Sequence, residues 1–438
     1  MSFAEAYEAV RAYCRRIQAS RHFQAEEVPL LQALGRVLAE PVLADRDFPP
    51  FPRATRDGYA VRAADLERDE PALLRVVGQV KAGDSYDLPV ASGEAVEIMT
   101  GAAMPQGADA VVMVEYTERK GPQPAKPELS GKQASAEPLD IGVDSAVEPV
   151  KVIDELVEIR RAAAAGENIV PAGAEAKAGQ ELLPHGTRLG VAQIAMAAAA
   201  GAARLKVFAK PRAAILSTGD ELVDVAEKPG PSQIRNSNSY SLAALVAAGG
   251  GEPVQLPIAP DEEGKLTELI QEGLKADLLL LSGGVSMGKF DLVEKVLKEL
   301  GAEFFFTGAM IQPGKPVVFG HVAADLQGRK PASREDVNST VEDRALIQNK
   351  SHTGFFGLPG NPVSVMVTFE LFARPVLEAL SGAEPSHLKS AKARLKKELK
   401  TRTGLTRFLP AVIEGELYDP EVELVPWQGS GDLLAAAK

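Results

Sequence analysis

The sequence predicts a multidomain protein that combines an α/β domain with β-rich domains. Three observations support this fold class. At 438 residues the chain is long enough for about two to four domains. Four consecutive leucines, Leu278–Leu281, suit a strand buried on both faces, as in a parallel sheet. Short apolar runs separated by turn residues recur over residues 43–163 and again after residue 391, which is typical of β-rich domains.

The stretch Asp277–Pro316 predicts half of a phosphate-binding α/β domain. After the leucines comes Ser282–Gly284, where the absence of Cβ atoms lets backbone N–H groups approach an anion. A helical pattern follows over Phe290–Gly301, then a strand over Glu303–Phe306 and a proline-fixed turn that carries Lys315. Ligands of such folds bind beyond the carboxyl ends of the strands.

The same stretch contains an incomplete nucleotide-binding motif. Gly283–Lys289 matches the first seven positions of a P-loop. The eighth position is Phe290, where the motif needs a Ser or Thr hydroxyl to hold magnesium. We therefore do not interpret the segment as the P-loop of an NTPase.

Composition narrows the class of partner. The formal net charge of −12 argues against nucleic acid or an anionic membrane as the main partner, so a polyanionic substrate needs a local site. Cys14 is the only cysteine, which excludes disulfides within the chain and zinc sites built from cysteine. The five histidines show no ligand spacing and there is no HExxH motif. No signal peptide or membrane span is evident, so we expect a cytoplasmic protein.

The N-terminal region begins with a helix. Ser2 and Glu5 form a capping box, and an apolar stripe follows on one face, made of Phe3, Tyr7, Val10, Cys14 and Ile17. Cys14 on this stripe is interpreted as a core residue and not as a reactive thiol. A second amphipathic segment, Pro29–Leu38, ends at Pro41.

A stiff segment with three prolines leads into Asp57-Gly58 and a strand that begins at Tyr59. Two interpretations remain open here. Asp57 is either part of a simple Asp-Gly turn or a carboxylate fixed at a rigid corner. Further strands are expected at Leu73–Val80, Ala95–Met99 and Val111–Val114, with Thr100-Gly101 as a small-residue loop.

Two polar segments, residues 119–152 and 325–352, are predicted to be insertions because they lack hydrophobic periodicity. An alanine-rich helix is expected through Ala197–Ala200. The second insertion splits a hairpin whose strands are Val317–Gly320 and Phe355–Leu358.

Polar turns follow two further predicted elements. The strand Pro211–Leu216 runs into Ser217-Thr218-Gly219-Asp220-Glu221, which places two carboxylates at a strand end. Arg235–Ser239 precedes a helix over Ser241–Ala248; its small polar residues are either N-caps or ligands of a phosphate or ribose. Leu358–Ser364 enters an apolar helix that continues to Leu380, with Pro362 in the first turn.

Seven motifs occur together and in order: DGYAV, MTGAAMPQGADAVVMVE, ILSTGDELV, IRNSNSYSLAAL, LLLLSGGVSMGKFDLV, QPGKPVVFG and GLPGNPVSVMVTFELFARP. Each is weak alone, but the ordered set is specific. With them the chain resembles the molybdopterin molybdenumtransferase family, which includes the C-terminal part of gephyrin. The resemblance extends from the N-terminal helix to about Ser430, apart from the two insertions.

The resemblance implies an elongated subunit of four parts. These are an N-terminal helical part (1–42 with 164–205), a β-rich domain (43–163), a three-layer α/β molybdopterin-binding domain (206–381) and a small C-terminal β domain (382–438). It implies a homodimer whose active sites join the α/β domain of one subunit to the β-rich domain of the other. The implied reaction inserts molybdate into adenylylated molybdopterin with Mg²⁺, releasing AMP and forming molybdenum cofactor. Molybdopterin adenylyltransferase and molybdoenzyme apoproteins are implied partners.

The resemblance also assigns residues. Catalytic roles fall on Asp57, Thr100, Glu221, Asp291 and Lys315. Metal ligands are Asp57, Glu221, Asp261 and Asp291, whose oxygens suit a divalent cation. Residues that bind the pterin substrate are Ser217, Thr218, Gly219, Asn238, Ser239, Ser282, Gly283, Gly284, Ser286, Pro359, Gly360, Asn361 and Pro362. The dithiolene that captures the metal belongs to the substrate, which agrees with a chain that has one cysteine.

The chain departs from the family pattern in four places. Many members have lysine where this chain has Gln312, which removes one charge from the anion pocket. Glu175 stands in a Gly-Ala-Glu run instead of Gly-Glu-Asp, and Thr55 replaces a common serine. After Gly431 the family usually continues through another pair of strands, so the predicted C-terminal domain is incomplete relative to that pattern.

Two other functions are compatible with the motifs. A gephyrin-like scaffold that binds a partner peptide would not need the carboxylates Asp57, Glu221 and Asp291, and all three are present. Molybdopterin adenylyltransferase uses a similar Gly-Gly loop but is usually an α/β domain alone, so the β-rich domain argues against it. The sequence does not distinguish molybdate from tungstate as the oxyanion.

Overall fold

The computed structural model describes most of the chain, namely residues 1–66, 71–121, 155–284, 292–323, 352–385, 388, 390–400, 404–416 and 418–437. Ser286, Asp291 and most of the two expected insertions lie outside these residues. The chain forms two compact units. One consists of Val42–Leu183, and the other of Met1–Pro41 together with Pro184–Lys438.

The Val42–Leu183 unit is built on a six-stranded sheet with the order β7-β4-β6-β5-β9-β8. The strands are β4 (Gly58–Val61), β5 (Ala72–Val80), β6 (Glu94–Ile98), β7 (Ala110–Met113), β8 (Thr117–Lys120) and β9 (Glu155–Ile159). The smaller elements are β2 (Val42–Leu43), β3 (Arg53–Ala54), η2 (Ala63–Leu66), η3 (Val114–Tyr116), β10 (Ile169–Val170) and β11 (Glu181–Leu183). The strands expected near residues 73–80, 95–99 and 111–114 are confirmed.

Strand β4 lies between β6 and β7 and is buried on both faces. Tyr59 and Val61 pack into one hydrophobic cluster, and Ala60 packs into the other. A Cβ on Gly58 would lie 1.9 Å from the carbonyl oxygen of Val112, so a residue without a side chain is needed where β4 pairs with β7. This pairing fixes the backbone directly after Asp57.

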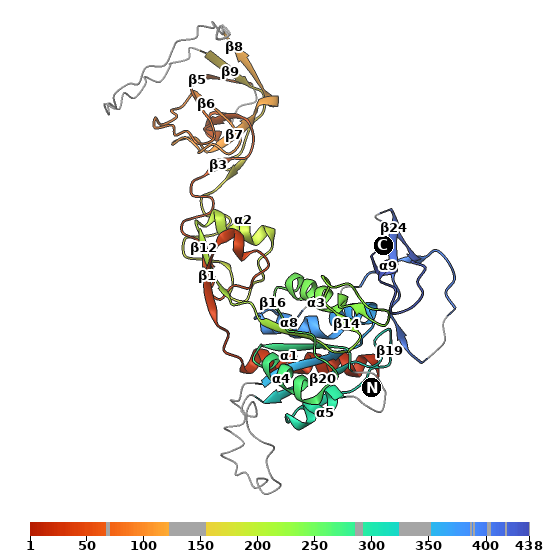
Figure 1. Cartoon of the computed structure of the whole chain (residues 1–438). Helices are drawn as coiled ribbons and strands as arrows, with labels where there is room; N and C mark the ends of the chain where they lie inside the picture. Colours follow the sequence, from red (N-terminus) through yellow and green to blue (C-terminus); the bar gives the residue numbers. More distant parts are fainter. Residues whose placement is uncertain are drawn as a thin grey trace, which may run out of the picture. The chain divides into compact units, whose positions relative to one another are not determined.

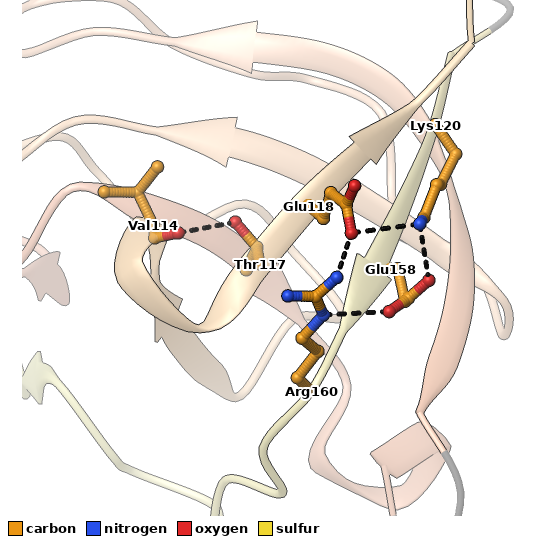
Figure 2. A network of polar contacts seen from close by, with 6 residues as sticks. All are labelled: Val114, Thr117, Glu118, Lys120, Glu158 and Arg160. Atoms are coloured by element: carbon orange, nitrogen blue, oxygen red, sulfur yellow. Dashed lines mark hydrogen bonds and ion pairs between the residues drawn. The ribbon is translucent and has the colours of Figure 1, made fainter.

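Strand β8 forms an edge of this sheet and pairs with β9 alone. It includes Arg119 and Lys120, so regular structure continues past the expected start of the first insertion. Figure 2 shows opposite charges meeting at the two strands: Lys120 Nζ lies 2.9 Å from Glu118 and 3.0 Å from Glu158, and Arg160, directly after β9, contacts both carboxylates. Charged side chains of this kind discourage further strands from pairing with an edge.

The second unit contains a six-stranded sheet with the order β16-β13-β17-β21-β20-β18. Its strands are β13 (Arg212–Ser217), β16 (Glu252–Gln255), β17 (Leu278–Ser282), β18 (Glu303–Phe306), β20 (Val318–Ala323) and β21 (His352–Leu358). The first four strands of that order are parallel, and β20 runs antiparallel to both of its neighbours. The predicted strand of four leucines is confirmed, and so is the hairpin that became β20 and β21.

Helices cover both faces of this sheet. One core contains Leu278 and Leu280 together with α1 (Phe3–Ser20), α3 (Ser237–Ala248), α7 (Pro362–Thr368), η5 (Phe369–Ala373) and α8 (Arg374–Leu380). The other contains Leu279 and Leu281 together with α4 (Glu263–Gly273) and α5 (Leu292–Glu299). Figure 1 shows α3 and α8 on one side of the sheet and α4 and α5 on the other. The three-layer α/β arrangement is therefore confirmed.

Helix α1 begins with the predicted capping box, in which the Ser2 hydroxyl accepts from the Glu5 N–H at 3.3 Å. Its apolar face packs against the α/β sheet and α8. Cys14 is buried in this core, and burial raises the pKa of its thiol to about 12. Its interpretation as a core residue is confirmed.

Other elements complete this unit: β1 (Ala25–Pro29), η1 (Leu30–Ala33), α2 (Val191–Ala199), β12 (Arg204–Phe208), β14 (Leu222–Val223), β15 (Ile234–Arg235), β19 (Ile311–Gln312), β22 (Arg394–Leu395), β23 (Thr406–Arg407), β24 (Ala411–Glu416), β25 (Asp419–Leu424) and α9 (Leu433–Ala436). Within Pro29–Leu38 the structure has one short 3₁₀ turn, η1. Helix α2 starts six residues before the expected alanine run. The small C-terminal sheet has the order β22-β25-β24.

None of the helices in the described part of the chain combines the length and the apolar character needed to cross a lipid bilayer.

Candidate functional site

Three parallel strands of the α/β sheet end side by side. Ser217 of β13 pairs in register with Ser282 of β17, which pairs in turn with Leu358 of β21. Each strand leads into a turn of small or polar residues, at 218–221, 283–284 and 359–361. We call this set of turns the carboxyl edge. Their common location is the position where α/β proteins bind ligands.

Backbone contacts hold these turns together. The Thr218 N–H donates to the carbonyl oxygen of Ser282 at 3.0 Å, and the Gly283 N–H donates to that of Leu358 at 3.3 Å. Gly283 has a φ of 89°, and a Cβ there would lie 2.5 Å from the Thr218 carbonyl oxygen. Glycine is therefore required for both the backbone conformation and the close approach.

The N-terminus of α3 reaches this edge through Asn236, which caps the helix by accepting from the Ser239 N–H at 3.1 Å. The Asn236 amide also donates to the Ser239 hydroxyl at 2.7 Å, and the Ser217 hydroxyl lies 2.9 Å from that of Ser239. All three side chains are buried. Ser217 and Ser239 therefore position the start of α3 through contacts with each other. Asn236 is confirmed as an N-cap, and the ligand interpretation of Asn238 and Ser239 stays a prediction.

Asn238 connects two of the turns directly. Its side-chain amide donates to the Ser282 hydroxyl at 2.9 Å and to the Gly360 carbonyl oxygen at 2.7 Å. The side-chain oxygen of Asn238, Oδ1, is buried and has no hydrogen-bond partner among the described residues. An acceptor without a partner, next to the Gly283-Gly284 turn, is suited to a donor group of a bound ligand.

The acidic residues lie on the turn after β13. The Asp220 carboxylate accepts from the Asp261 N–H at 3.1 Å, and Asp261 accepts from the Thr218 hydroxyl at 3.2 Å. The Glu221 carboxylate folds over Gly219, where a Cβ would lie 2.4 Å from Oε2. The structure therefore connects Asp261, which the family resemblance indicated, to Thr218 and Asp220 on the turn that also carries Glu221.

The turn after β21 contains Pro359, Gly360, Asn361 and Pro362. Asn361 is the N-cap residue of α7, and Pro362 occupies the first helical position, as expected. The Asn361 side-chain amide donates to the Ser430 hydroxyl at 2.8 Å, and the Val363 N–H donates to the Ser430 carbonyl oxygen at 3.0 Å. The C-terminal segment thus contacts the carboxyl edge.

Lys315 lies on the turn between β18 and β20, which begins at the same end of the sheet. Its side chain is exposed and has no ion-pair or hydrogen-bond partner among the described residues. It borders a cavity of about 360 Å³ that Met1 and Phe306 also line. Gly314 fixes the turn against α7, because a Cβ there would lie 2.4 Å from Thr368 Cγ2.

Asp57 and Thr100 form a separate pair in the Val42–Leu183 unit. The Asp57 carboxylate accepts from the Thr100 backbone N–H at 2.7 Å and from its hydroxyl at 2.8 Å. These two hydrogen bonds hold the pKa of Asp57 below its usual value, and the bond from the Thr100 backbone N–H contributes more than the bond from its hydroxyl. Both side chains are exposed. Of the two interpretations of the Asp-Gly turn, a carboxylate fixed at a rigid corner agrees with these contacts.

Comparison with known proteins gives two matching family models, the "MoeA N-terminal region (domain I and II)" over residues 1–201 and the "Probable molybdopterin binding domain" over residues 214–379. The molybdopterin molybdenumtransferase of Bacillus subtilis is 32% identical over 95% of this chain and 85% of its own length. That of Nostoc sp. is 35% identical over 82% of this chain and 70% of its own length. The chain belongs to the molybdopterin molybdenumtransferase family.

Solved structures agree with this membership. Two MoeA molybdopterin biosynthesis proteins from Pyrococcus horikoshii align with 99% and 100% of this chain and with 92% and 93% of theirs. Their TM-scores are 0.65 and 0.70, at 30% and 27% identity. As a member of this transferase family, the chain takes part in molybdenum cofactor biosynthesis.

Resemblance to the transferase family implies Mg²⁺, and the side chains present can be compared with the oxygen ligands that this ion needs. No group of three or more His, Cys, Asp or Glu side chains within the described residues is placed to hold a metal ion. Mg²⁺ usually takes one or two carboxylates and completes its octahedron with water and substrate phosphate oxygens. Asp261 contacts Thr218 and Asp220 on the turn that also carries Glu221, so Mg²⁺ at this turn would have one or two carboxylate ligands and would need a phosphate substrate and water to supply the others.

Sequence reasoning included Asn236 among the N-cap candidates and Asp220 among the carboxylates at a strand end, but it assigned neither to the site and missed Ser430. Asn236 and Asp220 stood inside recognised motifs, and their hydrogen bonds depend on the positions of α3 and of the loop at Asp261. Ser430 carried no signal beyond its flanking glycines, since its role depends on how the C-terminal segment folds back.

We predict that Thr100→Val raises the pKa of Asp57 part of the way toward the unfolded value of about 3.9, because the backbone N–H bond remains when the hydroxyl is lost. Since the folded pKa of Asp57 is lowered, its hydrogen bonds stabilise the fold above that unfolded value and are lost as pH falls through the folded pKa. NMR titration of the Asp57 carboxyl carbon measures the change.

Thr55→Val is the matched control, because Thr55 is a neighbouring threonine that makes no hydrogen bond to Asp57 in the described part of the chain. It should leave the Asp57 titration unchanged. An unchanged Asp57 pKa in Thr100→Val would contradict a contribution from the hydroxyl.

Proposed function

We propose that this chain inserts molybdenum from molybdate into the dithiolene of adenylylated molybdopterin, releasing AMP and forming molybdenum cofactor. The observation that supports this most directly is the carboxyl edge. Glycine turns, an acidic turn and the N-terminus of a helix meet there, at the ends of three neighbouring parallel strands. A substrate with a phosphate, a pyrophosphate and a pterin needs these three kinds of group together.

In this proposal the Gly283-Gly284 turn holds the pterin phosphate, because its backbone N–H groups can approach the oxygens without obstruction by side chains. Asn238 Oδ1 accepts a hydrogen bond from a donor on the pterin, which would satisfy its unpartnered atom. Ser217 and Ser239 hold α3 in register, so that Asn238 keeps its bonds to Ser282 and Gly360. In this proposal these residues of the chain orient the pterin substrate.

The acidic turn is the proposed place for Mg²⁺, held by Glu221 and Asp261 and, by family resemblance, by Asp57 and Asp291. When bound, the ion neutralises charge on the pyrophosphate that is cleaved as AMP leaves. The Thr218 hydroxyl orients Asp261 toward this role, and the Asp261 N–H orients Asp220. The two hydrogen bonds from Thr100 fix the orientation of the Asp57 carboxylate as a ligand.

We further propose that the chain acts as a homodimer. The Asp57–Thr100 pair and the carboxyl edge belong to different compact units, and in the proposed dimer the pair from one subunit completes the edge of the other. The reaction class also requires a supplier of adenylylated molybdopterin and acceptors of the finished cofactor. Molybdopterin adenylyltransferase and molybdoenzyme apoproteins fill these roles in the proposal.

The direct test measures AMP release from adenylylated molybdopterin in the presence of molybdate and Mg²⁺. The wild-type protein should release AMP only when both are present. Glu221→Gln should slow the release greatly while the fold is retained, because one oxygen ligand loses its charge. Absence of AMP release by the wild type, or wild-type turnover by Glu221→Gln at limiting Mg²⁺, would contradict the proposal. Lys265→Ala, on the exposed face of α4, is the control.

Assembly gives a second prediction. If one subunit supplies Asp57 and the other supplies Glu221, mixed dimers of Asp57→Asn and Glu221→Gln protomers contain one site with both defects and one with neither. Each heterodimer then has one intact site. Mixing the two inactive variants under subunit exchange should therefore give, per heterodimer formed, about half of the activity of a wild-type dimer. No recovery, with heterodimers demonstrated by mass spectrometry, would place both residues in a site within one chain.

Lys315 and Gln312 give a third prediction. A charge-assisted hydrogen bond contributes about 1.5–3 kcal/mol, so Lys315→Ala should raise the molybdate concentration for half-maximal rate by roughly ten- to hundred-fold. Gln312→Lys should lower that concentration by less, because its exposed side chain remains solvated. Titration of molybdate at fixed pterin substrate measures both. A Lys315→Ala variant that changes only the affinity for the pterin would identify Lys315 as a phosphate ligand.

A further inference from the structure

A larger cavity lies at the opposite end of the same sheet. Its volume is about 720 Å³, which is within the range of small-molecule sites. It is lined where strands β13, β17 and β21 begin, by Arg212, Asp277 and His352, and by the end of α1. A five-residue strand is about 16 Å long, so the cavity is separated from the carboxyl edge by roughly that distance. We call it the amino-edge cavity.

The lining is basic although the chain carries a net charge of −12. Its five lysine and arginine side chains outnumber its three carboxylates. Two of those carboxylates are already engaged. Asp277 pairs with Arg21 at 2.7 Å and accepts from the Arg212 backbone N–H at 2.7 Å. Glu26 pairs with Arg36 at 2.5 Å.

Three lining cations, Arg16, Lys210 and Arg212, have no carboxylate within ion-pair distance among the described residues. The Arg16 guanidinium lies 3.5 Å from His352 Nε2, and the third lining carboxylate, Glu252, is the register partner of Arg212 on the neighbouring strand. They come from the end of α1, from the segment before β13 and from the start of β13. Like charges that converge on one cavity repel each other, and an anion bound between them removes that repulsion. Two of the three are arginines, whose planar guanidinium groups match the oxygens of phosphate groups.

One wall of the cavity is aromatic. Phe23 lines it and packs on Phe208 with ring centroids 5.1 Å apart, and the Arg21 guanidinium lies 5.9 Å from the Phe23 ring centroid. A half-buried ring beside a basic wall offers a planar apolar group a surface to stack on. The cavity thus combines cations for phosphates with an apolar surface for a ring.

We propose that the amino-edge cavity binds a phosphate-bearing anion of nucleotide size. Arg16, Lys210 and Arg212 hold the phosphate oxygens, and Phe23 contacts the rest of the ligand. The site is distinct from the carboxyl edge, because it shares none of the turn residues 218–221, 283–284 or 359–361. The binding proposed for this cavity does not depend on the reaction proposed above, and its test is independent of that reaction.

The test is isothermal titration calorimetry of the full chain with ADP and, separately, with pyrophosphate, in buffer with EDTA so that no divalent cation favours the carboxyl edge. The wild type should bind ADP, and the affinity should fall as salt is raised from about 50 to 300 mM, because screening weakens exposed charge pairs. The double variant Lys210→Ala/Arg212→Ala removes two charge-assisted bonds and should bind roughly a hundred-fold more weakly. Arg16→Ala alone should bind roughly ten-fold more weakly.

The matched control is Lys265→Ala/Lys397→Ala, which removes the same charge from exposed lysines outside the cavity and should bind ADP as the wild type does. Thermal melts show that each variant is folded, and Arg16→Ala replaces the double variant if that one is not. Equal binding of pyrophosphate and ADP supports a site for phosphate alone, whereas tighter binding of ADP supports a role for Phe23. No binding by the wild type, unchanged binding by both cavity variants, or equal loss in the control would overturn the proposal.

Discussion

The register of three parallel strands is the constraint on which the α/β unit depends. Because β13, β17 and β21 pair residue for residue, Ser217, Ser282 and Leu358 finish their strands together. Alternate leucines of β17 enter the two cores on either side of the sheet, so a shift of one residue would exchange the contents of both cores. The packing of apolar side chains therefore determines where the polar turns are placed, although none of those turns belongs to a core.

The strands themselves were predictable because their signals are local. The run Leu278–Leu281 is apolar without interruption, and the glycines after it end the strand within the same few residues. The start of α3 was less predictable. The apolar pattern suggested Ser241, but the helix begins at Ser237 because Asn236 caps it with its own side chain. The order of the motifs identified the family, and the resemblance to that family supplied the candidate site residues.

Contacts between distant parts of the sequence could not be predicted from the residues. Asp57 and Thr100 are 43 residues apart, and they meet because β4 and β6 are antiparallel with Gly58 opposite Ile98. The amino-edge cavity was missed for a related reason. A charged residue at the start of a strand, such as Arg212, has the pattern of an ordinary solvated position until the fold brings the end of α1 to the same cavity. Ser286 and Asp291 stay predictions, since they lie outside the described residues.

The C-terminal segment is attached to the α/β unit at two places. The Phe408 N–H donates to the Gln312 carbonyl oxygen at 2.8 Å, and Ser430 accepts from the Val363 N–H at 3.0 Å. The first attachment is reinforced, because β23 pairs with β19 and the Phe408 ring packs on Phe3 of α1 with ring centroids 5.4 Å apart. One stretch of chain therefore holds both the turn before Lys315 and the turn that begins α7, and its removal would release both turns at once.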